Sequence, residues 1–275
     1  MSRSPWCSRE PSRTVAPMFN AEVAIIGGSG LYDFFADSSR TVVDTPYGAP
    51  SGPISIGSLD DRSVAFLPRH GDGHAYPPHA INYRANLWAL ASLGVKQILA
   101  PCAVGGLTAK LETGALVAPD QVVDRTTSRV STFVTSGALH APFADPYCAR
   151  LRGALARQSN VVRGGTMVVI EGPRFSSRAE SRAYAAAGWE LINMTGCPEA
   201  ALARELGICY QPLALITDLD AGLAEGEGVH TEDVLALFAA NLPALRRALV
   251  TWLGDLPDAT DCDCRTWTEP LEFWP

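Results

Sequence analysis

Two aspartates separated by a single residue are the side chains most suited to proton chemistry in this sequence. Asp218 and Asp220 follow the apolar run 213–217, and alternation along an extended segment places both carboxylates on the same side. One carboxyl group can donate a proton to a leaving nitrogen while the other accepts a hydrogen bond from an exocyclic amine, provided that burial and mutual repulsion raise a pKa. The alternative is an Asx-type cap on the turn that follows at residues 221 and 222.

A glycine-rich run offers a first group that can bind an anion. The sequence Gly27-Gly28-Ser29-Gly30 follows a strand-like stretch, so backbone amides and the Ser29 hydroxyl can approach a phosphate. The dinucleotide fingerprint requires a third glycine at the position where Asp33 stands. A tight turn without a ligand is the alternative.

An adjacent arginine and histidine offer a second anion-binding group. Arg69 and His70 place a forked cation beside an imidazole at the end of an apolar strand, a pairing suited to a phosphate dianion. A solvated surface pair is the alternative. His74 and His79 lack this context, and both are expected in a surface loop.

Short apolar runs precede all of these groups, which indicates that strands position them. β-Branched runs alternate with segments of helical periodicity, the pattern of an α/β fold: a single domain with a central mixed β-sheet flanked by helices. Strands are predicted at 23–26, 64–68, 97–101, 115–123, 166–171, 191–194 and 213–217. Helices are predicted at 80–93, 144–157, 177–187, 199–206 and 231–252, the last with Thr231 as its N-cap and a kink or break at Pro243. Ligands bind at the carboxyl ends of strands in open α/β sheets, so the residues after these strands are expected to share one site.

Composition limits the class of protein. A chain of 275 residues with 47% hydrophobic and 19% charged residues is typical of one globular enzyme domain, assigned to residues 20–255 between a disordered extension at 1–19 and a C-terminal tail at 256–275. The formal net charge of -7 argues against a nucleic-acid-binding surface. The first 19 residues lack the apolar centre of a signal peptide, and no apolar run reaches the roughly 18 residues of a membrane helix. A cytoplasmic protein that binds small molecules is expected.

Cysteine usage indicates free thiols. The cysteines lie mostly in apolar segments, which predicts buried thiols in a reducing compartment rather than a disulfide framework. Cys262 and Cys264 form the one close pair, and the five histidines supply no second cluster of ligands. No metal site is therefore predicted.

In combination, these segments resemble the methylthioadenosine phosphorylase branch of the trimeric nucleoside phosphorylase family, over about residues 23–249. The matching motifs are Ile26-Gly27-Gly28-Ser29-Gly30-Leu31, Asp44-Thr45-Pro46-Tyr47-Gly48, Arg69-His70-Gly71, Asp124-Arg125-Thr126, Glu171-Gly172-Pro173-Arg174-Phe175-Ser176-Ser177-Arg178-Ala179-Glu180, Asn193-Met194-Thr195 and Thr217-Asp218-Leu219-Asp220. So many motifs in one order are far more specific than any single glycine loop.

The resemblance implies a role for each matching position. Phosphate is expected at Ser29, Arg69, His70, Cys102, Ala103 and Thr195. The purine and ribose are expected at Phe175, Ser176, Met194, Asp218 and Asp220, and the 5′ pocket at His140, Thr231, Val234 and Leu235. Within the acid pair, Asp218 is implied as the partner of the imidazole-ring nitrogen of the base, and Asp220 as the partner of its 6-amino group.

The activity implied by the resemblance is phosphorolysis of 5′-methylthioadenosine to adenine and 5-methylthioribose 1-phosphate by a homotrimer. Phosphate attacks C1′ as the bond to the base loosens, and Asp218 protonates the departing base. Inorganic phosphate is the co-substrate, and no metal or redox cofactor is implied. Alternatives are a phosphorylase acting on adenosine, inosine, guanosine or a 5′-halogenated adenosine, and a non-catalytic nucleoside sensor. An NAD-dependent enzyme is disfavoured by the incomplete dinucleotide fingerprint.

Some positions depart from the family pattern. Cys102 stands where relatives often place Thr, and a thiol is the poorer hydrogen-bond partner. It is expected to be a buried, inert thiol rather than a nucleophile. Thr231 and the adjacent His230 are more polar than an aliphatic lining, which keeps a 5′-hydroxyl open as an alternative to a methylthio group. The aromatic tail is expected to pack on its own subunit or near the active site of a neighbour.

Overall fold

A mixed β-sheet forms the centre of the computed structural model, which describes residues 20–28, 31, 35, 38–59, 62–137, 139–221, 223, 228–256, 262–266 and 275. The strands are β1 (Val23–Gly27), β2 (Ser38–Thr41), β3 (Ile54–Leu59), β4 (Arg62–Pro68), β5 (Gln97–Gly106), β6 (Leu116–Ala118), β7 (Gln121–Arg125), β8 (Val161–Arg163), β9 (Thr166–Ile170), β10 (Leu191–Asn193) and β11 (Cys209–Leu219). The main path of the sheet runs β2-β3-β4-β1-β5-β10-β9-β7, and β11, β6 and β8 branch from β5. Parallel and antiparallel pairs occur together, which confirms the predicted fold class.

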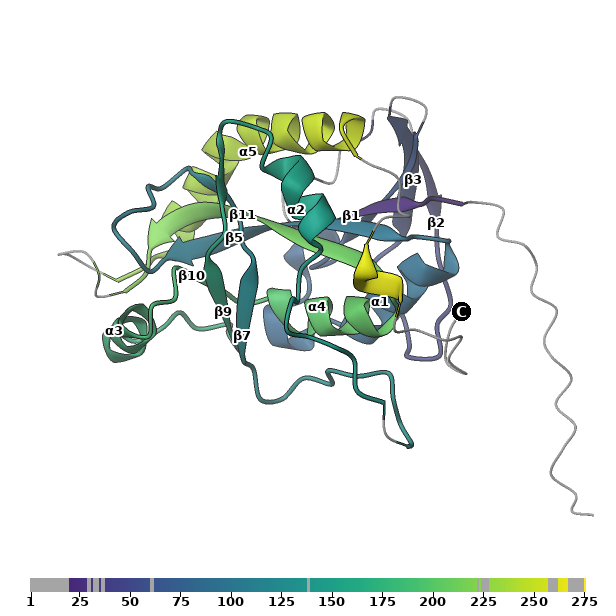
Figure 1. Ribbon diagram of the computed structural model, residues 1–275, viewed down its shortest axis with the longest axis horizontal. Helices are drawn as coiled ribbons and strands as arrows, with labels where there is room; N and C mark the ends of the chain where they lie inside the picture. Colours follow the sequence, from purple (N-terminus) through teal and green to yellow (C-terminus); the bar gives the residue numbers. More distant parts are fainter. Residues whose placement is uncertain are drawn as a thin grey trace, which may run out of the picture.

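The long strands β5 and β11 form the axis of the sheet (Figure 1). They pair in parallel from Gln97 opposite Cys209 to Gly106 opposite Leu219. The start of β5 also pairs in parallel with β1, whereas its end pairs antiparallel with β10. This change of neighbour is a switch point in the strand order, which is where α/β sheets bind ligands.

Helices cover both faces of the sheet (Figure 1). They are α1 (Tyr83–Ser92), α2 (Ala149–Leu155), α3 (Arg178–Ala186), α4 (Gly196–Glu205) and α5 (Thr231–Gly254), with short 3-10 turns η1 (Asp72–His74), η2 (Pro78–Ala80) and η3 (Asp263–Arg265). Helices α1 and α4 bury Leu87, Leu90 and Leu202 on one face. Helices α2 and α5 bury Leu151 and Trp252 on the other face. The central strands β1, β5 and β11 are thus shielded from water on both sides and held as a rigid platform.

Helix α5 is long and apolar enough to cross a membrane by length and composition alone. Leu245, Leu249 and Trp252 are nevertheless buried in the core cluster that α5 shares with α2 and β11. One apolar face packed on a sheet is typical of a helix in a globular domain. We therefore assign α5 to the core layer of the protein.

The start and centre of α5 differ from the sequence prediction. Its N-cap is His230, without a side-chain cap, and Thr231 is its first helical residue, so the predicted Thr231 cap is wrong. The helix continues past Pro243 without a break. Packing of its apolar face compensates for the hydrogen bond that proline removes.

Three strands were absent from the sequence prediction, and one predicted strand is divided. Strand β2 is exposed and polar, and β8 has three residues, so neither shows a clear apolar pattern. Strand β3 was also missed, although its first three residues are buried. The run 115–123 forms β6 and β7, separated by Pro119 and Asp120. The strands that precede the predicted site residues were all found, with β5 and β11 longer than expected.

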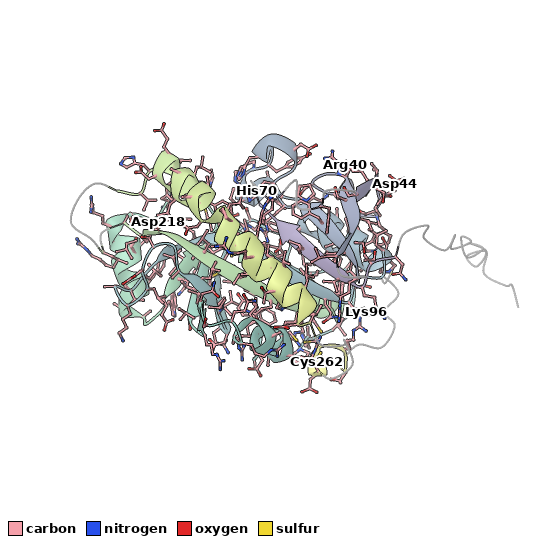
Figure 2. The ribbon with its side chains drawn as sticks, turned by 90° about the horizontal axis from the view of Figure 1, so that it is seen from above. Arg40, Asp44, His70, Lys96, Asp218 and Cys262 are labelled. Atoms are coloured by element: carbon pink, nitrogen blue, oxygen red, sulfur yellow. The ribbon has the colours of Figure 1, made fainter. Side chains whose placement is uncertain are left out.

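The described part of the C-terminal tail packs at the amino end of β11. Cys262 Sγ lies 3.2 Å from Sγ of Cys209, the first residue of β11, whereas Asp218 lies near the other end of that strand. Figure 2 accordingly shows Cys262 and Asp218 on opposite sides of the molecule. Residues 262–266 are therefore remote from the predicted site. The predicted extension 1–19 and residues 267–274 of the tail lie outside the described residues.

Candidate active site

A cavity of about 220 Å³ opens at the carboxyl ends of β4, β5, β10 and β11 and is closed on one side by α5. The predicted site residues that line it are Arg69, His70, Cys102, Ala103, Phe175, Ser176, Met194, Thr195, Asp218, Asp220, Val234 and Leu235. Ser29 lies outside the described residues, although its neighbour Gly28 lines the cavity. The fold thus brings residues from distant parts of the chain to one site, as the strand ends predicted.

Arg69 is held by groups that lie far from it in the sequence. Its guanidinium makes a two-point ion pair with Glu199, through Nε to Oε2 and Nη2 to Oε1, both at 2.9 Å. It also donates to the carbonyls of Pro101 and Ile26 at 3.0 Å. Burial opposes the charge, but the carboxylate of Glu199 keeps the pKa of Arg69 raised. Four of the five N–H groups of Arg69 are engaged by described residues, and the second N–H of Nη1 has no partner among them.

His70 is neutral in this site. Its Nδ1 lies 2.9 Å from the carbonyl of Tyr76, which can only accept, so Nδ1 carries the proton and Nε2 has a free lone pair. Burial lowers the pKa of His70 to about 3, and the charge of Arg69 contributes. The prediction of a cation beside an imidazole that titrates is therefore corrected for the imidazole. Arg69 is a buried cation, whereas His70 is neutral and can accept a hydrogen bond at Nε2.

His74 belongs to the site, contrary to its predicted place in a surface loop. It lies in η1, stacks on the ring of His70 with centroids 4.0 Å apart, and lines the cavity. The turn that carries it contains Gly71 at φ 72, where a Cβ would lie 2.8 Å from the backbone oxygen of Ser51. Glycine at 71 thus permits the close approach of this turn to Ser51 and Tyr76.

Thr195 is positioned by the residue two places before it. The Asn193 Oδ1 accepts from the backbone amides of Thr195 and Gly196, both at 2.7 Å, and its Nδ2 donates to the carbonyl of Ala103 at 3.0 Å. The carboxyl end of β10 is thereby tied to β5. Because this turn is already rigid, Thr195 and Met194 lose little conformational entropy when a ligand binds at the cavity.

Arg129 is a positioning residue that the sequence analysis missed. It is buried and donates to the carbonyls of Met194 at 2.8 Å and Glu171 at 2.6 Å, and its Nε lies 3.2 Å from a carboxylate oxygen of Glu171. It also donates to Cys197 at 2.6 Å, at the start of α4. One side chain thus joins the ends of β9 and β10 to α4. The motif at residues 124–126, shortly before Arg129, matches the family pattern, but nothing in its spacing indicates a role for Arg129.

Asp218 has the altered acidity that a proton donor needs. Burial raises its pKa to about 6, and the charge of Asp220 contributes, while the Thr217 hydroxyl that donates to Asp218 Oδ2 at 2.9 Å opposes the rise. Pairing between β11 and β5 shifts by one residue at this point, so Asp218 lies opposite Gly105. A Cβ on Gly105 would lie 3.0 Å from Asp218 Oδ1, so glycine leaves room for the carboxylate.

Asp220 is fixed by a different partner. Its side chain is buried, and Oδ2 accepts a hydrogen bond of 2.5 Å from the hydroxyl of Ser181 in α3. Helix α3 starts with a capping box between Ser177 and Glu180, which sets the place of Ser181 one turn later. Asp218 and Asp220 both line the cavity, as their alternation predicted, but they differ in surroundings and can take separate roles.

Two residues of the segment after β9 face the same cavity. Phe175 is half-buried and offers a ring on which a flat base can stack. The Ser176 Oγ is buried and makes no hydrogen bond to the described residues. A buried hydroxyl is costly without a partner, so a ligand in the cavity is the natural acceptor or donor for it.

The wall contributed by α5 is apolar. Val234, Leu235 and Phe238 line the cavity on this side. Thr231 and His140 were predicted for the same pocket, but both are exposed and neither is among the lining residues of this chain. Thr231 begins α5 one turn before the wall, and His140 lies in the loop before α2, which explains the difference.

Cys102 lines the cavity as a neutral thiol. It is 8% exposed, and burial raises its pKa to about 12. Since the thiolate is the reactive form, Cys102 is not poised as a nucleophile. The sequence expectation of an inert thiol agrees with this environment.

Comparison with known proteins gives the family. Residues 22–253 match the phosphorylase superfamily. The S-methyl-5′-thioadenosine phosphorylase of Mycobacterium tuberculosis is 55% identical over 241 residues, covering 87% of this chain and 91% of that protein. The purine nucleoside phosphorylase of Streptomyces coelicolor is 52% identical over 264 residues, covering 91% of this chain and 94% of that protein.

A solved structure agrees with this assignment. Methylthioadenosine phosphorylase from Schistosoma mansoni in complex with adenine has a TM-score of 0.81 and 38% identity, covering 86% of this chain and 91% of that chain. The chain therefore belongs to the phosphorylase superfamily. It is a pentosyltransferase of the group that cleaves nucleosides with phosphate.

Proposed function

We propose that this enzyme phosphorolyses 5′-methylthioadenosine to adenine and 5-methylthioribose 1-phosphate. The observation that carries the choice of substrate is the apolar wall of Val234, Leu235 and Phe238 in the cavity that also holds the acid pair. The relatives at 55% and 57% identity bear the name of this activity. Thr231, the residue that favoured a 5′-hydroxyl, is not among the lining residues, and the described residues of α5 that do line the cavity are all apolar.

In the proposed reaction, phosphate occupies the part of the cavity near Arg69, His70 and Thr195. The remaining Nη1 proton of Arg69 and the hydroxyl of Thr195, whose contact to Asn193 Oδ1 is long at 3.4 Å, donate to phosphate oxygens. The lone pair on His70 Nε2 accepts the hydroxyl proton of hydrogen phosphate. A phosphate oxygen attacks C1′ while the C1′–N9 bond breaks and its electron pair leaves on the base. Phosphate is thus oriented rather than activated, and positioning supplies much of the rate.

The departing base is neutralised by Asp218 in this proposal. Its carboxyl proton goes to N7 of adenine, and the proton lost by hydrogen phosphate as it becomes the ester restores the balance. The raised pKa of Asp218, about 6, makes the protonated form available near neutral pH. Asp220, held by Ser181, accepts from the 6-amino group, and the unpartnered Ser176 Oγ faces another edge of the base.

The proposal also includes finer properties that the resemblance implies. The enzyme is a cytoplasmic homotrimer, inorganic phosphate is its co-substrate, and no metal or redox cofactor takes part in the reaction. Light scattering of the purified protein tests the trimer. Activity after exhaustive dialysis against a chelator tests the absence of a catalytic metal.

A panel of nucleosides tests the substrate. Purified protein is incubated with and without phosphate and with 5′-methylthioadenosine, adenosine, inosine or guanosine, and the free base is quantified by chromatography. We expect phosphate-dependent release of adenine, with kcat/KM for 5′-methylthioadenosine at least about tenfold above that for adenosine, the discrimination typical of one small apolar group. Base release without phosphate, or no release at all, would overturn phosphorolysis.

A purine nucleoside phosphorylase is the second candidate. The Streptomyces coelicolor relative at 52% identity carries that name. Equal or faster cleavage of inosine in the panel would favour this candidate. The carboxylate of Asp220 favours the first, because it accepts from an amino group and repels a 6-oxo group.

A further inference from the structure

The fold gathers four cysteines that the sequence leaves far apart. Cys148 is the N-cap of α2, Cys209 is the first residue of β11, and Cys262 and Cys264 come from the tail around η3. Their Sγ atoms all lie within 4.8 Å of one another. We call this set the cysteine cluster. A four-ligand metal site needs a second pair of ligands beside Cys262 and Cys264. The histidines do not supply this pair in the sequence, but the fold supplies it as Cys148 and Cys209.

The spacing of the cysteine cluster fits a tetrahedral metal ion. Zinc–sulfur bonds of about 2.3 Å place tetrahedral sulfurs about 3.8 Å apart. The sulfurs of Cys209 and Cys262 are 3.2 Å apart and every other pair lies within 4.8 Å, so small movements complete the geometry. The ligands are also shielded, since Cys148, Cys209 and Cys264 are buried and Cys262 is half-buried.

The surroundings of the cluster suit negative charge on the sulfurs. The guanidinium Nη2 of Arg150 donates to Cys209 Sγ at 3.5 Å and is held by Gln97 Oε1 at 2.8 Å. Four thiolates around a divalent ion carry a net charge of −2, and a cation that hydrogen-bonds a ligand sulfur stabilises such a site. A cluster of neutral thiols would need no oriented guanidinium.

We propose that the cysteine cluster binds one zinc ion through four thiolates. Binding forms four Zn–S bonds and releases the thiol protons to solvent, without any redox step. Four protein ligands leave no open position for a substrate, so the site is structural rather than catalytic. It fastens η3 and the tail to α2 and to the amino end of β11, whereas the acid pair lies at the carboxyl end of the same strand (Figure 2).

Metal analysis of the full-length protein tests the proposal. The protein is produced in zinc-supplemented medium, purified without chelator or polyhistidine tag, and analysed by mass spectrometry for metals. We expect about one zinc per chain, as for a closed four-cysteine site. Cys264→Ser and Cys148→Ser should lose the ion. The matched control is Cys197→Ala, since Cys197 is a buried cysteine of α4 outside the cluster, and it should retain the ion.

Cobalt substitution gives a readout that does not depend on the variants folding. Zinc is removed from wild-type protein with a chelator under reducing conditions and replaced by Co²⁺. The expected spectrum has strong sulfur-to-cobalt charge-transfer bands in the near ultraviolet and the visible bands of tetrahedral cobalt. Zinc removal should also lower the melting temperature, and zinc should restore it, while the pH profile of phosphorolysis keeps its shape.

Two results would overturn the proposal. One is a zinc content far below one per chain together with no tetrahedral cobalt spectrum. The other is a disulfide between any two members of the cluster, mapped by mass spectrometry in protein isolated under thiol-blocking conditions, because an oxidised pair cannot supply two thiolates. Each result is independent of whether the enzyme cleaves 5′-methylthioadenosine.

Discussion

The carboxylate of Glu199 occupies two of the five donors of Arg69 in the floor of the cavity, with both side chains almost wholly withdrawn from solvent. The pair therefore has a structural role in addition to its place beside the proposed phosphate site. A buried cation that loses its counter-charge keeps its desolvation cost and loses the compensating attraction.

Glu199→Gln should accordingly destabilise the protein strongly. It preserves shape but leaves Arg69 as an uncompensated charge, and we expect the free energy of unfolding to fall by about 3–5 kcal/mol. Urea denaturation measures this, and the KM for phosphate should rise in the same variant. The control is Glu22→Gln, which breaks an exposed pair with Lys96 and should cost at most about 1 kcal/mol. Equal losses in the two variants would contradict the role of burial.

Asp218 should determine how the rate depends on pH. Its pKa is raised to about 6, so the protonated, donating form predominates below that value and is depleted above it. We expect kcat/KM for 5′-methylthioadenosine to fall as pH rises through this region. Asp218→Asn should lower kcat/KM on the order of 10²- to 10⁴-fold and remove this pH dependence. Asp124→Asn, at an exposed carboxylate, is the control. If the fall persisted in the Asp218 variant, another group would be the acid.

Asp220 should determine which purine is preferred. Asp220→Asn converts an acceptor into a group that can donate to a 6-oxo oxygen, so the ratio of kcat/KM for inosine to that for adenosine should rise. An unchanged ratio would count against its contact with the base. Ser181→Ala removes the hydroxyl that holds Asp220 and should lower kcat/KM for adenine nucleosides without reversing the preference.

Val234 should contribute to the preference for a methylthio group. Val234→Thr keeps the shape but adds a hydroxyl to the apolar wall, so the ratio of kcat/KM for 5′-methylthioadenosine to that for adenosine should fall severalfold, within the roughly 10- to 200-fold worth of one apolar group. Val250→Thr makes the same change at an exposed position of α5. Identical ratios in the wild type and Val234→Thr would place the 5′ group elsewhere.

Local patterns were sufficient to predict the strands that position the site. Asp218 and Arg69 each follow an apolar run, and the parallel pairing of β4, β1, β5 and β11 brings them to one edge of the sheet. Met194 also follows an apolar run, but its strand β10 is antiparallel to β5, so the rule for parallel strands does not account for its place. The polar edge strand β2 was missed because its side chains lie in solvent and its sequence has no apolar alternation. Sequence resemblance supplied the substrate class, which the strand pattern alone does not contain.

Partnerships between distant residues could not be predicted from spacing. Glu199 lies 130 residues from Arg69, so nothing local indicated that most of the guanidinium is already bound. Arg129 acts through the carbonyl oxygens of the residues that directly follow β9 and β10, and backbone acceptors carry no sequence signature. The cysteine cluster depends on the same kind of long-range contact, since Cys148, Cys209 and the two tail cysteines lie far apart in the sequence.

The one-residue shift between β5 and β11 decides whether the acid pair faces the cavity or the hydrophobic core. Ile216 lies opposite Val104 and points into the core with it. In an uninterrupted ladder Asp218 would lie opposite Gly106 and point the same way as Ile216. The bulge sets it opposite Gly105 and turns it to the other face. A relative could thus retain both aspartates and, with a regular ladder, direct them into its interior. Under the proposed mechanism, a relative with this activity must keep both aspartates and also the one-residue shift that sets Asp218 opposite Gly105.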